Sequence, residues 1–385
     1  MKKFLVLAAL LLPCIVRAGT APLKTTYGPW IQNVTENSFT VLWVTEEKTL
    51  SWIEVGKDDG SVWNQTGGRE CHYETVTGRR VTGTFHSVTV SGLEKATTYC
   101  YRILGKPVTD ESDPYAISYG AVRAARGTHK VKTLDHSAPA CRFSMVNDMH
   151  FDDAKYAALM KGMDRKKTDF IVLNGDIVSF SNSQDTFIKH TFAPIADLAG
   201  DFPVFFARGN HETRGSEFHL LPKAFPTSTG EFYYTFRQGP VAFIVLDAGE
   251  DKPDNDPEYS DQADFDRYRA AELEWLEKVI ESPEIKNAPK KICIIHIPTI
   301  DGPGAWYTQH WIARNFNPVL NRAGIDLMLS AHHHRYILAN PGEYGNDFPI
   351  VINSNDERLD AEVTSDGIVI RTFDRNGKEI HSLKY

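Results

Sequence analysis

The stretch DFIVLNGD, residues 169–176, decides the fold of this 385-residue chain. Four consecutive apolar residues lead straight into a polar Asn-Gly-Asp end, which is typical of a short strand buried on both faces. Runs of the same kind recur at RFSMVND (142–148), FPVFFARGNHE (202–212), VAFIVLDAGE (241–250), KICIIHIP (291–298) and IDLMLSAHHH (325–334). With helical segments between them, such strands predict a layered α/β domain with a mostly parallel or mixed sheet.

Helical segments separate some of these strands. Residues 152–167 (DDAKYAALMKGMDRKK) and 261–282 (DQADFDRYRAAELEWLEKVIES) are both predicted to be helices. In the second, apolar residues recur at helical spacing, so one face of this helix is expected to pack on the domain. The C-terminal runs FPIVINS, DGIVIRTFD and KEIHSLKY are expected to add further strands.

The N-terminal third has a different residue pattern. From about residue 22 to residue 132, short β-branched and aromatic runs alternate with turn residues, as in NSFTVLWVT (37–45), LSWIEVG (50–56), HSVTVSG (86–92) and TTYCYRILG (97–105). Such a series predicts a β-sandwich. The segment DHSAPA (135–140) marks a boundary, so we divide the chain into a signal peptide (1–18), a sandwich (19–134) and an α/β domain (139–385).

The first twenty residues have the form of an export signal. Two lysines precede an apolar run from Phe4 to Val16, and Val16-Arg17-Ala18 offers small residues at the positions that a signal peptidase reads. The run is too short for a membrane span, which takes about 20 apolar residues. We therefore expect a secreted or periplasmic protein. Anchoring as a lipoprotein through Cys14 is the less favoured alternative, because Pro13 precedes that cysteine.

The net charge of the chain argues against one class of binding partner, nucleic acid. Loss of Lys2, Lys3 and Arg17 with the signal changes the formal charge from −8 to −11. So acidic a chain is not expected to be an obligate nucleic-acid binder. Beyond the leader, no segment is apolar enough to predict a transmembrane helix, and the sequence identifies no partner protein.

Four cysteines remain after the leader. Cys141 and Cys293 lie in or beside apolar strands and are expected to be buried free thiols. A disulfide between Cys71 and Cys100 stays open, since an exported protein can form one. No Cys-x-x-Cys pair occurs in the sequence, which argues against a cysteine zinc site.

The polar ends of the predicted strands carry the chemistry, because ligands of such sheets bind at the carboxyl ends of the strands. Seven side chains with metal-binding atoms fall there: Asp148, His150, Asp176, Asn210, His296, His332 and His334. Carboxylates, an amide oxygen and imidazoles suit Mn, Fe or Zn. Seven ligands, one of them a carboxylate that can bridge, predict two metal ions about 3.5–4 Å apart that clamp a phosphoryl group.

Each of these residues also has an ordinary structural reading. A single histidine such as His296 within a strand is often a hydrogen-bonded core residue, Asp176 alone could belong to a turn, and Asn210 alone could cap one. Their order and their common place at strand ends distinguish the set from these separate readings.

The motifs DMH, GD, GNHE, HIP and AHHH follow the order of the series D-x-H, GD, GNH[ED], H and GHxH. This resembles the signature of the calcineurin-like metallophosphoesterases and covers roughly residue 142 to the C-terminus. The resemblance implies that Asp148, His150 and His334 bind one metal and that Asn210, His296 and His332 bind the other. It also implies that Asp176 bridges the two metals, that His211 is a general acid or phosphate clamp, and that Glu212 orients His211.

Three histidines in a row follow the last of these strands. His332 and His334 are predicted to alternate along an extended segment and to face one side, so that each reaches one metal. His333 is then a spacer that points away. Ala331 stands where the family has the glycine of GHxH, so a methyl group must fit beside the metal-binding loop.

The sandwich carries a second resemblance. SGLEKATTYCYRI (91–103) resembles a strand corner of fibronectin type III domains, and GPWIQNVTENSFTVLWVT (28–45) resembles the domain in front of many purple acid phosphatases. Those enzymes have D-x-G and GD-x-x-Y where this chain has His150 and Ser179. We therefore expect a site without a tyrosine phenolate, and hence no obligate ferric ion and no purple colour.

The residues and the resemblance together predict an exported, metal-dependent phosphoesterase. It would hydrolyse phosphate monoesters of small molecules or polymers through a metal-bridging hydroxide. A phosphodiesterase or nucleotidase with the same site is an alternative, and a non-catalytic adhesion or glycan-binding protein is an alternative of another class. Catalysis is assigned to Asp176, His211 and Glu212, and substrate contact to Asn210, His211 and His310. His310 lies in GPGAWYTQHW (302–311), which reads as a pocket-forming loop.

Overall fold

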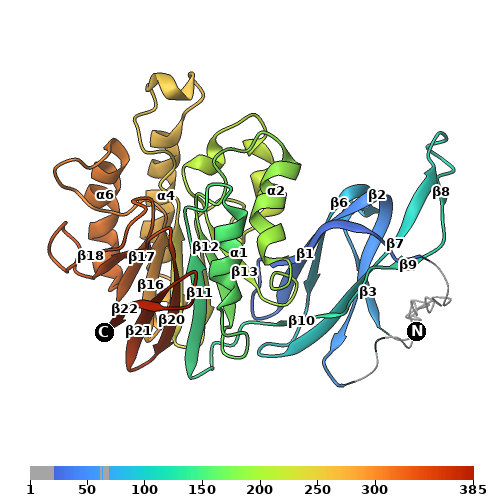
Figure 1. Ribbon diagram of the computed structural model, residues 1–385, viewed down its shortest axis with the longest axis horizontal. Coiled ribbons are helices and arrows are strands. Elements are labelled where there is room, and N and C mark those ends of the chain that lie inside the picture. Colours follow the sequence, from blue (N-terminus) through green and yellow to red (C-terminus); the bar gives the residue numbers. More distant parts are fainter. Residues whose placement is uncertain (1–20, 61–62, 64–68) are drawn as a thin grey trace, which may run out of the picture.

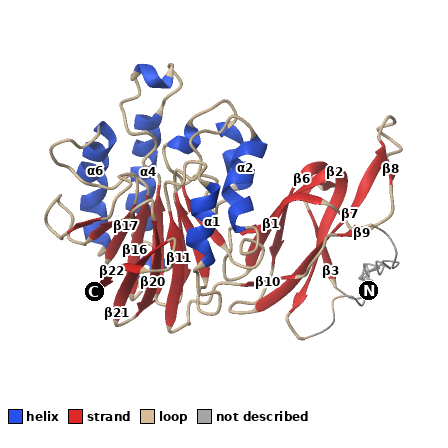
Figure 2. Cartoon of the chain, in the orientation of Figure 1, coloured by secondary structure: helices blue, strands red, loops and turns tan. Residues whose placement is uncertain are grey.

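The computed structural model describes residues 21–60, 63 and 69–385, in two parts that lie side by side (Figure 1). The predicted export signal, with Cys14, lies outside the described residues. The N-terminal part is built of strands, and the larger C-terminal part combines strands with helices (Figure 2). Within the described residues, none of the helices has both the length and the apolar character that crossing a membrane requires.

The N-terminal part is a β-rich domain centred on one long strand. Strand β2 (Ser38–Lys57) covers both of the strands predicted at 37–45 and 50–56, so the predicted break between them is wrong. Residues 46–49 contain no glycine or proline, and the strand instead shifts its register with β6 between Val44 and Thr49. Within the described residues, seven strands pair with β2, either directly or through β7. They are β1 (Thr25–Gln32), β3 (Glu70–Tyr73), β6 (Thr82–Ser91), β7 (Thr98–Asp110), β8 (Ser118–Tyr119), β9 (Arg123–Ala124) and β10 (His129–Lys132).

The C-terminal part contains two mixed six-stranded sheets. The first has the order β13 (Val204–Ala207), β12 (Phe170–Asn174), β11 (Ala140–Val146), β20 (Glu357–Thr364), β21 (Gly367–Asp374), β22 (Glu379–Lys384). The second has the order β14 (Tyr234–Gln238), β15 (Val241–Leu246), β16 (Lys290–Ile295), β17 (Leu327–Ser330), β19 (Ile350–Ile352), β18 (Ile337–Ala339). Strands β11 to β13 are parallel, as are β15, β16, β17 and β19, and the other pairs are antiparallel.

The two sheets pack face to face and helices cover their outer faces, as the sequence predicts for a layered α/β domain. Between the sheets, the Phe243 ring lies 5.5 Å from the Phe143 ring and 5.6 Å from the Phe170 ring. Helices α1 (Asp153–Lys161) and α2 (Gln184–Phe192) share a buried cluster with the first sheet, and α4 (Phe265–Val279) and α6 (Tyr307–Ala323) share one with the second. The order of layers is therefore α/β/β/α (Figure 2).

The helices differ in extent from the sequence prediction. Helix α1 ends at Lys161, six residues before the predicted end, because Gly162 caps it. Helix α4 begins at Phe265 rather than at residue 261. The stretch 302–311, predicted as a loop, becomes the start of α6 at Tyr307, where the Gln309 side chain accepts the Trp306 N–H at 3.0 Å and stabilises the first turn.

The two parts of the chain are joined by a packed interface. The Trp30 ring of β1 stacks on Phe192 of α2 at 4.4 Å, and its indole N–H donates to the Ala224 carbonyl at 3.2 Å. The Tyr101 hydroxyl donates to the Gly200 carbonyl at 2.6 Å. Both Trp30 and Tyr101 are fully buried, so the β-rich domain completes the hydrophobic core beside α2 and holds this flank of the α/β domain in place.

The four described cysteines are thiols rather than disulfides, so the open disulfide between Cys71 and Cys100 does not form. Cys71 pairs in register with Glu54 from β3, and Cys100 pairs with Gly56 from β7. The two cysteines thus flank opposite edges of β2, about two strand spacings of 4.8 Å apart. A disulfide needs Cα atoms within about 7 Å.

Acid is expected to destabilise the protein through His86, which is 1% exposed and bonds to Thr45 and Thr49. Burial lowers the pKa of His86 from 6.5 to about 4. Between these values the unfolded chain binds a proton that the folded chain does not, so stability is complete above pH 6.5 and falls as the pH drops toward 4. The loss is about 3 kcal/mol, at about 1.4 kcal/mol per unit of pKa shift.

The His86→Gln variant should lose this part of the acid sensitivity. Thermal unfolding at pH 6.5 and at pH 4 measures it, with chelator present throughout. His136→Gln serves as the control, since His136 lies half-exposed in the same part of the chain. An equal acid-induced drop in the His86→Gln and wild-type proteins would contradict the assignment.

Candidate metal centre

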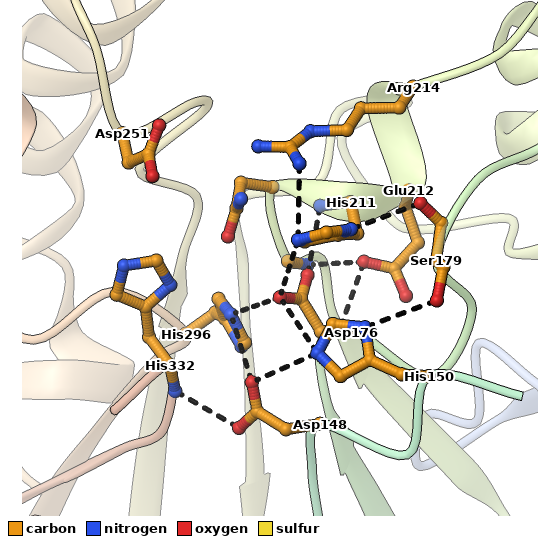
Figure 3. A network of polar contacts seen from close by, with 12 residues as sticks. Asp148, His150, Asp176, Ser179, His211, Glu212, Arg214, Asp251, His296 and His332 are labelled. Atoms are coloured by element: carbon orange, nitrogen blue, oxygen red, sulfur yellow. Dashed lines mark hydrogen bonds and ion pairs between the residues drawn. The ribbon is translucent and has the colours of Figure 1, made fainter. Parts of the chain in front are cut away.

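The predicted ligands meet where the strands of the two sheets end. Asp148 follows β11 and Asp176 follows β12, while His296 follows β16 and His332 follows β17. Figure 3 shows their side chains converging from these strand ends on one space. Three sets of side chains in the described residues have ligand atoms within 4.8 Å of one another: Asp148, His150, His334; His150, Asp176, His211; and Asp176, His296, His332.

The first set is the one proposed for the first metal. His334 Nε2 lies 3.2 Å from Asp148 Oδ1 and 3.2 Å from His150 Nε2. The second oxygen of Asp148 accepts from the Asn147 side chain at 2.8 Å and from the His332 backbone N–H at 3.0 Å. These two donors fix the carboxylate and leave Oδ1 facing the histidines.

The third set, Asp176, His296 and His332, is assigned to the other metal and holds the carboxylate proposed to bridge. Asp176 Oδ2 lies 3.2 Å from His296 Nε2 and 3.8 Å from His150 Nε2, so it faces histidines of both sets. Asp176 Oδ1 accepts the His211 backbone N–H at 2.9 Å. His296 Nδ1 donates to the Asn174 carbonyl at 2.7 Å, which leaves Nε2 as the atom free to bind a metal.

The donor set fits a pair of metal ions. Three buried atoms at the proposed ligand positions make no hydrogen bond among the described residues: Asp148 Oδ1 and His296 Nε2, which have only ion-pair contacts, the shortest at 3.2 Å, and Asn210 Oδ1. A buried polar atom without a partner is costly unless something else binds it. Together with the carboxylates and imidazoles around them, these three atoms match the oxygen and nitrogen ligands of Mn, Fe or Zn.

The pKa values of His296 and His332, the two histidines of the third set, are shifted in opposite directions. Burial lowers the pKa of His296, but Asp176 and Asp148 outweigh this and raise it to about 10. Burial and the nearby His296 lower the pKa of His332 to about 4. Without metal, His296 therefore carries a proton at neutral pH and His332 does not. Binding a metal at His296 must release that proton.

The backbone at the ligands is left-handed. Five of the seven proposed ligands have positive φ: Asp148 (54°), His150 (48°), Asp176 (53°), His332 (71°) and His334 (56°). Each such non-glycine residue costs about 1–2 kcal/mol. The prediction that His332 and His334 alternate along an extended segment is therefore wrong, because β17 ends at Ser330 and the histidines lie in a tight turn. His333 does turn toward α6, where its Nε2 lies 2.9 Å from Gln309 Nε2.

The ring of His211 is held from two sides. Its Nδ1 donates to the Ser179 carbonyl at 3.0 Å, and its Nε2 lies 3.2 Å from an Arg214 guanidinium nitrogen (Figure 3). Arg214 in turn bonds to both oxygens of Glu250, at 2.9 and 3.0 Å. His211 Nε2 lies 4.0 Å from Asp176 Oδ2, at the edge of the proposed metal site.

Glu212 has a different role from the one predicted. The prediction that it orients the His211 ring is wrong, since its carboxylate accepts backbone N–H groups of Asp176 at 3.0 Å, Ile177 at 2.8 Å and Gly209 at 2.9 Å. Burial and Asp176 raise the pKa of Glu212 to about 7, while the three donors favour the charged form. Glu212 thus ties the loop that carries Asp176 to the loop that carries Asn210.

Replacing Glu212 with glutamine should destabilise the metal-free protein by about 2–4 kcal/mol. The amide NH₂ would face backbone donors, and each buried donor left unpaired costs about 1–3 kcal/mol. Chemical unfolding in the presence of chelator measures the change. The exposed Glu274 of α4 provides the matched control, because Glu274→Gln should be neutral. Equal stability of the two variants would contradict this role.

The structure leaves one proposed substrate residue away from the cluster and adds others to it. His310 bonds to Asp301, which also binds Arg314 at 2.9 Å, and among the described residues His310 belongs to none of the three metal-binding sets. Sequence reasoning did not assign roles to Asn147 or to the Ser179 carbonyl. Only Asn147 had a signal, its position next to Asp148.

Two family models match the chain. Residues 141–336 match the calcineurin-like phosphoesterase model, and residues 29–118 match the model of the purple acid phosphatase N-terminal domain. Purple acid phosphatase 18 of Arabidopsis thaliana is 24% identical over 316 residues, which cover 77% of this chain and 62% of the relative. Purple acid phosphatase 15 of the same plant is 24% identical and is covered over 50% of its length. The chain thus spans less than two thirds of these relatives.

Solved structures share the fold. Purple acid phosphatase PPD1 from yellow lupin seeds superposes with a TM-score of 0.68 at 14% identity, over 94% of this chain and 74% of the lupin chain. PhoD superposes with a TM-score of 0.62 at 12% identity, over 95% of this chain and 94% of its own. Both alignments extend over the β-rich domain and the α/β domain.

Proposed function

Because the chain belongs to the calcineurin-like phosphoesterase family, we propose that it is an exported, dimetal-dependent phosphoesterase that hydrolyses phosphate monoesters. One observation supports this most directly. Asp148, Asp176 and His296 lie together, and His211 Nε2 lies 4.0 Å from Asp176 Oδ2, so a candidate metal site and a side chain that can transfer a proton adjoin one another. Export is proposed from residues 1–18 alone, and those residues lie outside the described part of the chain.

The residues of the site are proposed to have different roles in hydrolysis. We assign Asp148, His150 and His334 to one metal, Asn210, His296 and His332 to the other, and Asp176 to both. When bound, a metal pair supplies an activated water-derived nucleophile and positive charge for the phosphoryl oxygens. His211 is proposed to clamp the phosphate or to give a proton to the leaving oxygen, and the Ser179 carbonyl, which accepts from Nδ1, keeps the ring in the required orientation.

Metal analysis and a substrate panel on one preparation test the proposal. The expected result is about two metal ions per chain and faster hydrolysis of p-nitrophenyl phosphate than of bis-p-nitrophenyl phosphate. Preference for the diester would assign the site to a phosphodiesterase, and preference for nucleotides to a nucleotidase. Two bound metals without hydrolysis of any ester would overturn the proposal in favour of a non-catalytic binding protein.

The iron-loaded protein is expected to show no strong absorption band in the green part of the visible spectrum. Ser179 stands where purple acid phosphatases have tyrosine, and its hydroxyl lies 3.4 Å from His150 Nδ1. The two residues that differ from the purple acid phosphatase motifs, His150 and Ser179, therefore lie next to each other. His150 adds an imidazole to the proposed site, and Ser179 supplies no phenolate. An absorption spectrum after loading with iron measures this. A strong band in the green would show that another phenolate binds the metal.

A further inference from the structure

A cavity of about 730 Å³ is lined in part by Arg214, the residue that contacts the His211 ring. Its wall comes from the segment after the GNHE motif and from residues 258–271, which lead into and include the first turns of α4. None of the seven proposed metal ligands lines it. Its volume lies in the range of pockets that bind small organic molecules, about 300–1,000 Å³.

The cavity adjoins His211 through one residue pair. Arg214 and Glu250 both line the cavity, and they bond to each other at 2.9 and 3.0 Å. The opposite edge of the Arg214 guanidinium reaches His211 Nε2 at 3.2 Å. A group that is bound to phosphorus at the metal site, and whose oxygen lies near His211, can therefore extend past Arg214 into this space.

The aromatic side chains of the lining favour a flat group. Five rings are among the lining residues: Phe218, Phe232, Tyr259, Phe265 and Tyr268. Rings of this kind bind planar aromatic groups by stacking or edge contacts. Pockets that bind organic ligands combine such rings with a few placed polar groups.

Two arginines of the wall, Arg208 and Arg214, are already paired within the protein. Arg214 is paired with Glu250, and the buried Arg208 binds Asp247 through two nitrogens at 2.7 and 2.8 Å. The cavity therefore offers no free positive charge at these arginines to attract a further anion. The third guanidinium nitrogen of Arg208, Nη1, has no hydrogen-bond partner among the described residues. It leaves one unused donor in a wall that contains five aromatic rings and also the charged side chains of Glu231, Glu258, Asp264 and Arg267.

We propose that this cavity binds the leaving group of the substrate, and that the substrates are phosphate esters with a planar aromatic leaving group. The inference rests on the proposed phosphoesterase function. Hydrolysis breaks the P–O bond, water supplies the hydroxyl that stays on phosphate, and the leaving group departs as a phenol or alcohol with one proton. A bare phosphate or a small alkyl ester leaves the cavity empty.

Filling the cavity tests the proposal. Ala271 on α4 lines the cavity and is exposed, while the neighbouring exposed Ala270 is not among the lining residues. Ala271→Trp should lower kcat/KM for 1-naphthyl phosphate by about tenfold or more, because losing one well-packed group in an apolar pocket costs about that much. Hydrolysis of ethyl phosphate by the same variant should stay within about twofold of wild type. Ala270→Trp should change neither rate.

Hydrolysis of adenosine 5′-monophosphate distinguishes between two kinds of aromatic leaving group, a nucleoside and a simple aryl group. A loss with Ala271→Trp for this ester as well as for the naphthyl ester would support the proposal and identify a nucleoside as the leaving group. A loss confined to the naphthyl ester would support it and identify a simple aryl group.

Binding gives a readout that does not depend on turnover. Calorimetry should show 1-naphthylmethylphosphonate binding to the metal-loaded wild type more tightly than methylphosphonate does, with the difference abolished in Ala271→Trp. Equal effects of the two tryptophan variants on both ligands would overturn the cavity assignment while leaving the phosphoesterase function intact. If wild type hydrolyses no ester, the proposed function itself fails. The two failures are therefore distinguishable.

Discussion

Replacing Asp176 with asparagine is expected to reduce hydrolysis by about a thousandfold or more and to release bound metal. Asp176 Oδ2 faces His296 and His150, one from each proposed metal set, and no other carboxylate oxygen of the described ligands faces the same pair as closely. An amide at this position removes a negative charge between two cations. Metal pairs contribute several kcal/mol to catalysis, and each 1.4 kcal/mol corresponds to about tenfold in rate.

Elemental analysis of the purified variant and its turnover of p-nitrophenyl phosphate measure the two effects. Asp153→Asn is the matched control, because Asp153 also pairs with a histidine, His190 at 2.9 Å, outside the proposed metal sets. That variant should keep its metal and nearly all of its activity. If Asp176→Asn retained two metals and wild-type turnover, the bridging role would be excluded.

Replacing His211 with alanine is expected to lower kcat by about 10²–10⁴-fold while metal content stays near that of wild type. This is the usual size of a general acid contribution. His211 belongs to a different class from the ligands, because its two ring nitrogens already face the Ser179 carbonyl and Arg214. Its loss removes a proton-transferring group without removing any of the seven proposed metal ligands.

His333→Gln is the matched control for the His211→Ala variant. His333 lies between two proposed ligands, but its ring contacts Gln309 of α6, and His333→Gln preserves a polar partner there. That variant should keep both metal and turnover. Loss of metal in His211→Ala would show that His211 is a ligand, in line with its place in one of the three metal-binding sets, and would remove the proposed role.

The strands and the convergence of polar side chains at their ends followed from local sequence. DFIVLNGD becomes β12, with Asp176 two residues beyond its end, and KICIIHIP becomes β16, with His296 directly after it. A buried strand needs a nearly continuous apolar run, and a parallel arrangement brings the strand ends to one edge. Both features leave a strong local signal in the sequence.

Other features had no such signal because they depend on contacts between distant residues. The family resemblance implied that Glu212 orients His211, yet its partners are backbone groups that only the folded loops bring together. The start of α6 was hidden by glycine and proline residues at 302–304, and the Gln309 contact that supports its first turn appears only in the structure. The cavity lined in part by Arg214 joins residues 208 to 271, and no motif marks it.

The left-handed ligands set a limit on engineering this protein for robustness. A common stabilising strategy puts glycine where the backbone has positive φ, and Asp148, Asp176, His332 and His334 all meet that criterion. Each such change would relieve the backbone and delete a metal-binding side chain at once, which is a trade between stability and activity. A stability screen run without an activity assay would therefore select for inactive variants at these positions.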